Sequence, residues 1–120
     1  MLYHELLRDE GILLVRPQGR IQVGDFESVA RVVDPFIEEK GKLRGVMIEA
    51  QSFPGWDTFA ALLSHMRFVR DHHRAISKIA AVSDSPILSI MPQLAKHFVK
   101  ADIRHFNADD RDAALLWLRE

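Results

Sequence analysis

Short apolar runs of strand-like composition alternate with longer segments whose apolar residues recur every three or four positions. Residues 45–49, 78–83 and 102–106 are such runs, and each is followed by a segment with helical periodicity. A chain in which strands and helices alternate predicts a largely parallel sheet that helices cover on both faces. No other feature of the sequence constrains the fold as strongly.

The N-terminal part adds two further strands, at residues 3–8 and 12–16. The turn between them contains Gly11, which can adopt a positive φ, so we expect an antiparallel hairpin at one edge of the sheet. Helices are expected over residues 25–40, 58–70, 85–98 and 109–119. Pro35 should kink the first helix or restart it. The sequence thus predicts one α/β domain over residues 1–120, with a mixed, mostly parallel five-stranded sheet and four helices.

The length and composition of the chain exclude several classes of protein. Its 120 residues suit one domain with a hydrophobic core of its own. Cysteine is absent, which excludes a disulfide scaffold and a thiolate metal site. The N-terminus carries charged side chains where a signal peptide has an apolar core, and no apolar stretch approaches the roughly 18 residues that span a bilayer. We therefore expect a cytoplasmic protein without stable membrane insertion.

The charges are unevenly distributed along the chain. The formal net charge of −1 gives no reason to expect binding to nucleic acid. Residues 65–105, however, contain seven Lys and Arg side chains against three Asp, together with five of the six histidines. Such a basic face can attract an anionic ligand or a membrane surface. The alternative is an ordinary set of solvated helix faces, on which long basic side chains cover apolar surface.

Four segments, taken in order, carry a resemblance to a known family. They are Pro-Gly-Trp-Asp at 54–57, Lys-Ile-Ala-Ala-Val-Ser-Asp at 78–84, the run from Phe98 to Phe106, and Ala-Ala-Leu-Leu-Trp-Leu at 113–118. With the length and the element order, they resemble the SpoIIAA-like proteins. That family is related to STAS domains by fold and to Sec14/CRAL-TRIO domains by the architecture of the lipid site. The resemblance covers nearly the whole chain.

The resemblance implies two functional expectations. STAS antagonists of anti-sigma factors carry a phosphorylatable serine in an Asp-Ser-Ser/Thr-Gly motif after the third strand. Residues 55–58 read Gly-Trp-Asp-Thr here, so that serine is missing. Thr58 is the nearest hydroxyl, and we expect it to cap the following helix. The Sec14 resemblance implies an apolar cleft between the sheet and the helices.

The loop after the third strand contains the first candidate ligand-binding residues. Trp56 and Asp57 lie at the C-terminal end of a strand, where open α/β sheets bind ligands. Trp56 is expected either to wall or gate a pocket or to fasten the loop to the core. Asp57 is expected to cap the next helix; alternatively, it orients a ligand or binds Arg104. Arg104 is predicted on a buried-type strand, so we expect it to pair with Asp57, Asp84 or a ligand carboxylate.

Apolar side chains on two predicted helices complete the candidate site. They are expected to point inward and to line a closed apolar pocket with Trp56: Phe59, Leu63 and Met66 on helix 58–70, and Met91 on helix 85–98. Pro86 and Pro92 weaken the second helix, which suits either a lid or an irregular connecting helix. The Ser-Asp-Ser sequence at 83–85 should cap this helix, and an anion site there is the alternative.

No catalytic centre is recognisable in the sequence. It has no Gly-x-Ser-x-Gly elbow, no His-Glu-x-x-His motif and no P-loop. His65 and His72 share a helix face but lack a carboxylate to complete a zinc site, so we expect neither a metal nor another cofactor.

Two hypotheses about function follow, and an enzyme ranks behind both. The first is a non-enzymatic carrier of an apolar or amphipathic, lipid-like carboxylate, with the basic segment facing the head group. The alternative is a STAS-like regulatory module that binds a partner protein through the 53–58 loop and the next helix. A homodimer through the hairpin edge stays open, because an unpaired edge strand invites pairing.

Overall fold

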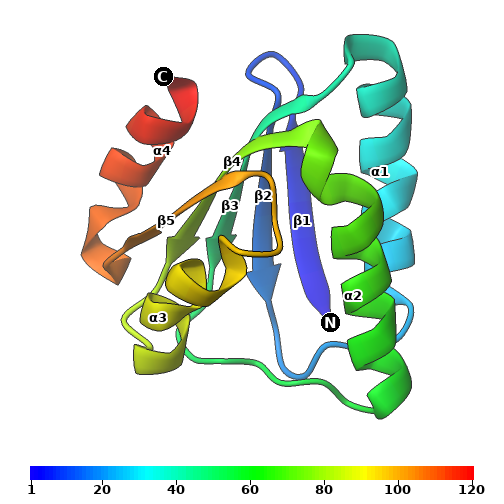
Figure 1. Cartoon of the computed structure of the whole chain (residues 1–120), viewed down its shortest axis with the longest axis vertical. Coiled ribbons are helices and arrows are strands. Elements are labelled where there is room, and N and C mark those ends of the chain that lie inside the picture. Colours follow the sequence, from blue (N-terminus) through cyan, green and yellow to red (C-terminus); the bar gives the residue numbers. More distant parts are fainter.

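The computed structural model describes all 120 residues, and its centre is a five-stranded sheet (Figure 1). The strands are β1 (Leu2–Leu7), β2 (Ile12–Pro17), β3 (Leu43–Glu49), β4 (Ile76–Val82) and β5 (Asp102–Phe106). Each strand pairs with its neighbour in the sequence, in the order β1-β2-β3-β4-β5. β1 and β2 are antiparallel across the turn at Gly11, whose φ is 69°, and all other pairs are parallel. The predicted mixed sheet with a hairpin edge is confirmed.

The four predicted helices are also present. They are α1 (Asp25–Lys40), α2 (Phe59–His72), α3 (Pro86–Ala95) and α4 (Arg111–Arg119), with short 3-10 turns η1 (His73–Ala75) and η2 (Ala108–Asp110). α1 runs through Pro35 without restarting. Pro35 lies on the exposed side of α1, where water can satisfy a carbonyl that loses its hydrogen bond to the helix. α3 ends at Ala95, so Phe98 lies in the segment after the helix.

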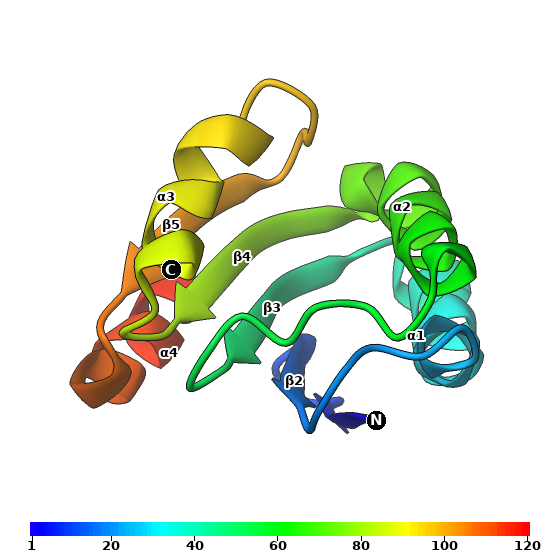
Figure 2. The same ribbon diagram turned by 90° about the horizontal axis from the view of Figure 1, so that it is seen from below.

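The strand order decides which helix covers which face of the sheet. The crossovers β2-α1-β3, β3-α2-β4 and β4-α3-β5 all advance in the same direction across the sheet. Because such crossovers are right-handed, α1, α2 and α3 lie on one face. α4 follows the edge strand β5 and folds back over the other face (Figures 1 and 2).

Each face of the sheet has a hydrophobic core of its own. On the α1 side, three residues of α1 join a core cluster with buried residues of β1, β2, β3 and β4: Val29, Val33 and Phe36. On the other side, Trp117 and Leu118 of α4 pack against Met47 and Ala80. Gly45 permits this close approach of α4, because a Cβ atom at that position would lie 2.7 Å from Leu118 Cδ2. None of the helices is both long enough and apolar enough to cross a membrane.

Candidate functional site

α2 packs against α1 through its aromatic and histidine side chains. His65 and Phe26 stack with 4.5 Å between ring centroids, and Phe68 lies 5.0 Å from the same Phe26 ring. One turn further, His72 Nε2 lies 2.6 Å from Asp34 Oδ1. These three residues of α2 share one side of the helix because they are spaced by three and four positions. They fix the rotation of α2 about its axis.

This rotation leaves the most apolar side of α2 facing away from α1. Phe59 is 72% exposed, Leu63 is 40% exposed and Met66 is 46% exposed. The prediction that these side chains point inward is wrong. The inward side is instead the one that carries His65, Phe68 and His72. His65 and Phe68 contact the ring of Phe26, and His72 lies within hydrogen-bond distance of Asp34, so this side is held against α1.

α3 also exposes an apolar stripe. It packs on the sheet through the buried Pro92, while Met91 is 40% exposed and its neighbours on the same stripe are more exposed still. We call the exposed apolar residues of both helices and the following turn the apolar α2–α3 surface. Its members are Phe59, Leu63, Met66, Ile87, Ile90, Met91, Leu94 and Phe98.

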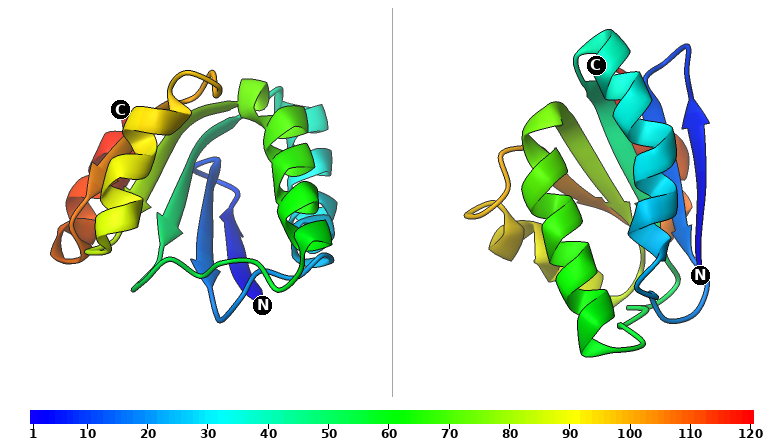
Figure 3. Two further views of the ribbon diagram at one scale, coloured as in Figure 1. Left: turned by 60° about the horizontal axis from the view of Figure 1, so that its bottom comes forward. Right: turned by 90° about the vertical axis from the view of Figure 1, so that its right-hand side faces the viewer.

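The sheet between the two helices is only partly covered. Ile79 and Ala81 of β4 point to the side of α1, α2 and α3, because they alternate with Ala80 and Val82 of the opposite core. Both remain partly exposed although β4 is an interior strand. Figures 2 and 3 show α2 and α3 on the same side of the sheet, with β3 and β4 between them. The candidate residues therefore form an open surface, and the predicted closed pocket is absent.

Trp56 fastens its loop to α2. Its Nε1–H donates a hydrogen bond of 3.1 Å to Nδ1 of His65. Its ring and that of Phe53 form a T-shaped pair with 5.3 Å between their centroids. Burial lowers the pKa of His65 from 6.5 to about 4, so the imidazole is neutral and its Nδ1 is free to accept. The geometry supports the interpretation of Trp56 as an anchor. The histidine partner was missed in the sequence, although the spacing of residues 61, 65, 68 and 72 marks one helix face.

The cap of α2 is Thr58. Its Oγ1 accepts a hydrogen bond of 3.1 Å from the main-chain N–H of Ala61, which confirms the prediction for Thr58. The prediction that Asp57 caps the helix is wrong, because α2 begins at Phe59 and the N-cap position falls one residue after Asp57. Asp57 is exposed, and its main-chain N–H donates to the carbonyl of Ile21 at 2.8 Å.

Arg104 lies apart from the other candidate residues. It is exposed on the α4 side of β5, and its guanidinium carbon lies 5.6 Å from the centre of the Phe106 ring and 5.8 Å from that of Trp117. The predicted ion pair with Asp57 or Asp84 is wrong: β5 is an edge strand, so Arg104 reaches solvent over two aromatic rings. The sheet separates Arg104 from the apolar α2–α3 surface.

The Ser-Asp-Ser sequence before α3 is engaged in local hydrogen bonds. Ser85 Oγ accepts from the main-chain N–H of Leu88 at 3.5 Å, and Ser83 Oγ accepts from that of Ser85 at 3.0 Å. Asp84 Oδ1 accepts from the N–H of Ala108 at 2.9 Å. The capping prediction is confirmed.

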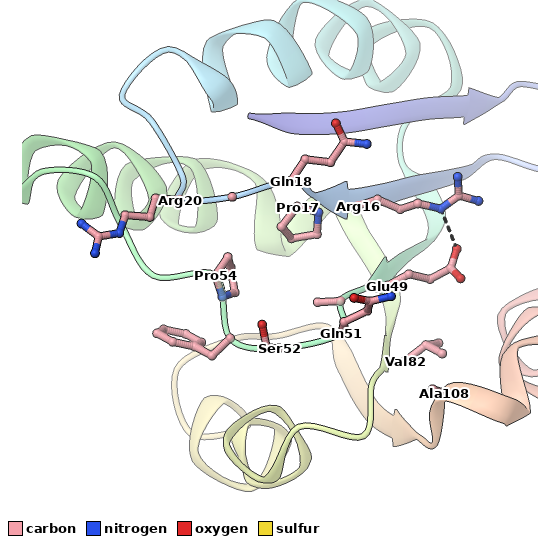
Figure 4. Close-up of a pocket in the computed structure, with 13 residues that line it drawn as sticks. Arg16, Pro17, Gln18, Arg20, Glu49, Gln51, Ser52, Pro54, Val82 and Ala108 are labelled. Atoms are coloured by element: carbon pink, nitrogen blue, oxygen red, sulfur yellow. Dashed lines mark hydrogen bonds and ion pairs between the residues drawn. The ribbon is translucent and has the colours of Figure 1, made fainter.

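A polar cavity of about 660 Å³ lies at the C-terminal ends of β2, β3 and β4 (Figure 4). Glu49 accepts hydrogen bonds from Arg16 Nε at 3.2 Å and from Arg111 Nε at 3.0 Å. Arg20 extends away from the Arg16–Glu49 pair in Figure 4. The charged side chains thus tie β2, β3 and α4 together and do not converge on one point. No three His, Asp or Glu side chains are grouped as metal ligands.

Comparisons with known proteins agree on the fold. The sequence model of the family described as SpoIIAA-like matches residues 12–119. The chain is also similar to the crystal structure of an uncharacterized protein from the DUF3478 family with a SpoIIAA-like fold, from Shewanella loihica PV-4, with a TM-score of 0.73. The two are 17% identical over 98% of this chain and 92% of that chain, so the likeness shows the fold alone. No curated protein matches the sequence.

Proposed function

This chain belongs to the SpoIIAA-like family, and we propose that it is a non-enzymatic binding protein for an apolar or amphipathic, lipid-like carboxylate. The apolar α2–α3 surface carries the proposal. Monomeric proteins rarely expose a large contiguous apolar patch unless something binds there. Here eight large apolar side chains on one side of the sheet are at least 40% exposed.

The surface offers apolar contacts for an alkyl chain on α2, α3 and the sheet. Phe59 and Leu63 are exposed on α2 and Met91 on α3, and Ile79 and Ala81 of β4 are partly exposed on the same side of the sheet. Each buried methylene of a ligand contributes about 0.8 kcal/mol, so a chain of modest length suffices for binding. The two methionines, Met66 and Met91, can adapt to ligands of different shape.

The head group has a candidate partner on α2. Arg67 follows Leu63 by one helical turn and is exposed, and no ion pair occupies it. A ligand whose carboxylate binds Arg67 can place its alkyl chain against Leu63. Arg104 no longer serves this purpose, since it lies across the sheet.

Titration with laurate tests the proposal. We expect wild-type protein to bind laurate, and Phe59→Ser and Leu63→Ser each to weaken binding by about tenfold, from the lost apolar burial. Arg67→Gln should weaken binding of laurate but not of the uncharged alcohol of the same chain length. The measurement is isothermal titration calorimetry below the micelle concentration, with native mass spectrometry for stoichiometry.

Leu116→Ser is the matched control. Leu116 is a 64% exposed leucine on α4, so its replacement removes a comparable side chain from the opposite side of the molecule. The proposal fails if laurate does not bind, or if Leu116→Ser weakens binding as much as Leu63→Ser does.

The openness of the surface favours a second candidate, a module that binds a partner protein. Phe59 is 72% exposed, which is more than we expect of a side chain that lines a ligand pocket. An apolar helix face of this kind can bind a helix of a partner protein. A photo-crosslinking residue at position 59 should then capture one discrete protein in cells, and the same residue at position 116 should not. Equal labelling from both positions would count against this candidate.

A further inference from the structure

We infer that α3 and the turn that follows it form a reversible docking surface for an anionic lipid bilayer. This inference goes beyond the binding of a small ligand: it shares the exposed residues of α3 with the proposed ligand site but uses none of those of α2. It rests on the exposure of one aromatic residue, on how that residue is held, and on the charges that flank it.

Phe98 is the most exposed large apolar side chain of the protein, at 82%. The turn that carries it is held firmly. The main-chain N–H groups of Phe98 and Val99 both donate to the carbonyl of Ala95 at 2.9 Å, and Val99 packs against the core. The N–H of Lys100 donates to Nδ1 of His73 at 2.9 Å. Phe98 is therefore presented to solvent by an anchored turn.

The apolar stripe of α3 continues the surface that Phe98 begins. Ile87, Ile90 and Leu94 are 50%, 55% and 58% exposed and lie along one side of α3 at spacings of three and four residues, and Phe98 lies in the turn after the helix ends at Ala95. Figure 2 shows the segment after α3 projecting far from the sheet, on the side where α2 and α3 lie. An apolar stripe that ends in a projecting aromatic residue is suited to the boundary between lipid head groups and acyl chains.

The charges of this segment select an anionic partner. Residues 85–101 contain Lys96 and Lys100 and no Asp or Glu, although the whole chain has a net charge of −1. Both lysines are exposed and lie on either side of Phe98. The bond from Lys100 to His73 also brings Arg74, the next residue of η1, close to the turn. Each basic residue near an anionic leaflet contributes about 1 kcal/mol, which is about a fivefold gain in affinity.

A bilayer fits these features better than a folded partner does. A flat, fluid surface needs no shape complementarity, and Phe98 is 82% exposed in the turn that projects beyond α3. Lysines that flank an apolar tip match lipid phosphates, and they hold the helix in the plane of the interface.

Co-sedimentation with unilamellar vesicles tests the inference. We expect binding to phosphatidylcholine vesicles that contain phosphatidylserine, and much weaker binding to phosphatidylcholine alone. Added salt should weaken the binding. Phe98→Ser should lower the partition coefficient by about tenfold. The double substitution Lys96→Gln and Lys100→Gln should lower it about 25-fold on anionic vesicles and change it little on neutral ones.

Two controls match these variants. Leu116→Ser removes an exposed leucine from α4, and the pair Lys40→Gln and Lys42→Gln removes two exposed lysines near the end of α1. Both should bind vesicles as wild type does. Because Phe98 is exposed, Phe98→Ser should keep the melting temperature, which circular dichroism checks.

Other outcomes overturn the inference. It is wrong if wild-type protein stays in the supernatant with anionic vesicles, or if it binds neutral and anionic vesicles equally. It is also wrong if sedimentation velocity shows a dimer that Phe98→Ser dissociates, since the stripe would then belong to an interface between two copies. Leu63→Ser should bind anionic vesicles as wild type does even where it loses laurate binding, because Leu63 lies on α2; a loss of vesicle binding in Leu63→Ser would count against a docking surface formed by α3 and its turn.

Discussion

Gly45 illustrates how one residue sets the distance between two layers of the fold. A Cβ atom there would meet Leu118 Cδ2 at 2.7 Å, and Leu118 is fully buried. Gly45→Ala should therefore destabilise the protein by about 1–3 kcal/mol, because the packed α4 must shift. Urea unfolding measures this loss.

Gly24→Ala is the control for Gly45, since Gly24 has a negative φ and open space around its Cβ position. Gly24→Ala should destabilise the protein by well under half as much as Gly45→Ala does. The loss at Gly45 should also shrink in a Leu118→Ala background, where the two positions no longer collide. Equal losses in both backgrounds would mean that the contact with Leu118 is not the cause.

His65 makes the stability of the protein depend on pH. Its pKa is lowered from 6.5 to about 4 by burial, so between these values the unfolded chain binds a proton that the folded chain does not. The contribution of His65 is complete above pH 6.5 and is lost as the pH falls towards 4, by up to about 3 kcal/mol. Unfolding free energies at about pH 7 and about pH 5 should show this slope.

The variant His65→Gln isolates the effect of the histidine from that of the carboxylates, which titrate in both proteins. It should be less stable than wild type near neutral pH and should lose less stability on acidification. If wild type and His65→Gln lose stability equally between the two pH values, the buried imidazole is not the titrating group.

At the scale of single elements, α2 shows where sequence patterns succeed and fail. The spacing of its apolar residues predicts a helix and its approximate ends, because backbone periodicity is a local property. Its rotation was predicted wrongly, since Phe26 and Asp34 of α1 select the face with His65, Phe68 and His72. Such a selection depends on contacts with a distant part of the chain. The prediction of an ion pair for Arg104 is wrong for a similar reason, because only the strand order reveals that β5 is an edge strand.

The start of α2 gives a prediction at this scale. Thr58→Ala should destabilise the protein by about 1 kcal/mol, because the N–H of Ala61 loses its acceptor. Asp57→Ala should have little effect, since the Asp57 side chain caps nothing. Thermal and urea unfolding of the two variants compare adjacent polar residues in one loop. If Asp57→Ala destabilises the protein more than Thr58→Ala does, then Asp57 caps α2 and Thr58 does not.

At the scale of the whole molecule, the alternation of strands and helices predicts the sheet, its hairpin edge and the four helices. These features follow from local periodicity and from the handedness of crossovers. The openness of the apolar α2–α3 surface does not follow, because it depends on how far apart two helices settle on the sheet. The candidate residues Phe59, Leu63, Met66 and Met91 were identified from the sequence, but as the lining of a closed pocket.

Chemical-shift mapping by heteronuclear NMR decides whether the apolar α2–α3 surface is a ligand site. On titration with laurate, we expect shifts that cluster on residues 59–66 of α2, residues 87–94 of α3 and the strand residues Ile79 and Ala81. The amides around Leu116 on α4 should stay unchanged. Shifts centred on α4 or around Arg16 and Glu49 in the polar cavity, or no shifts at all, would mean that the apolar α2–α3 surface is not the ligand site.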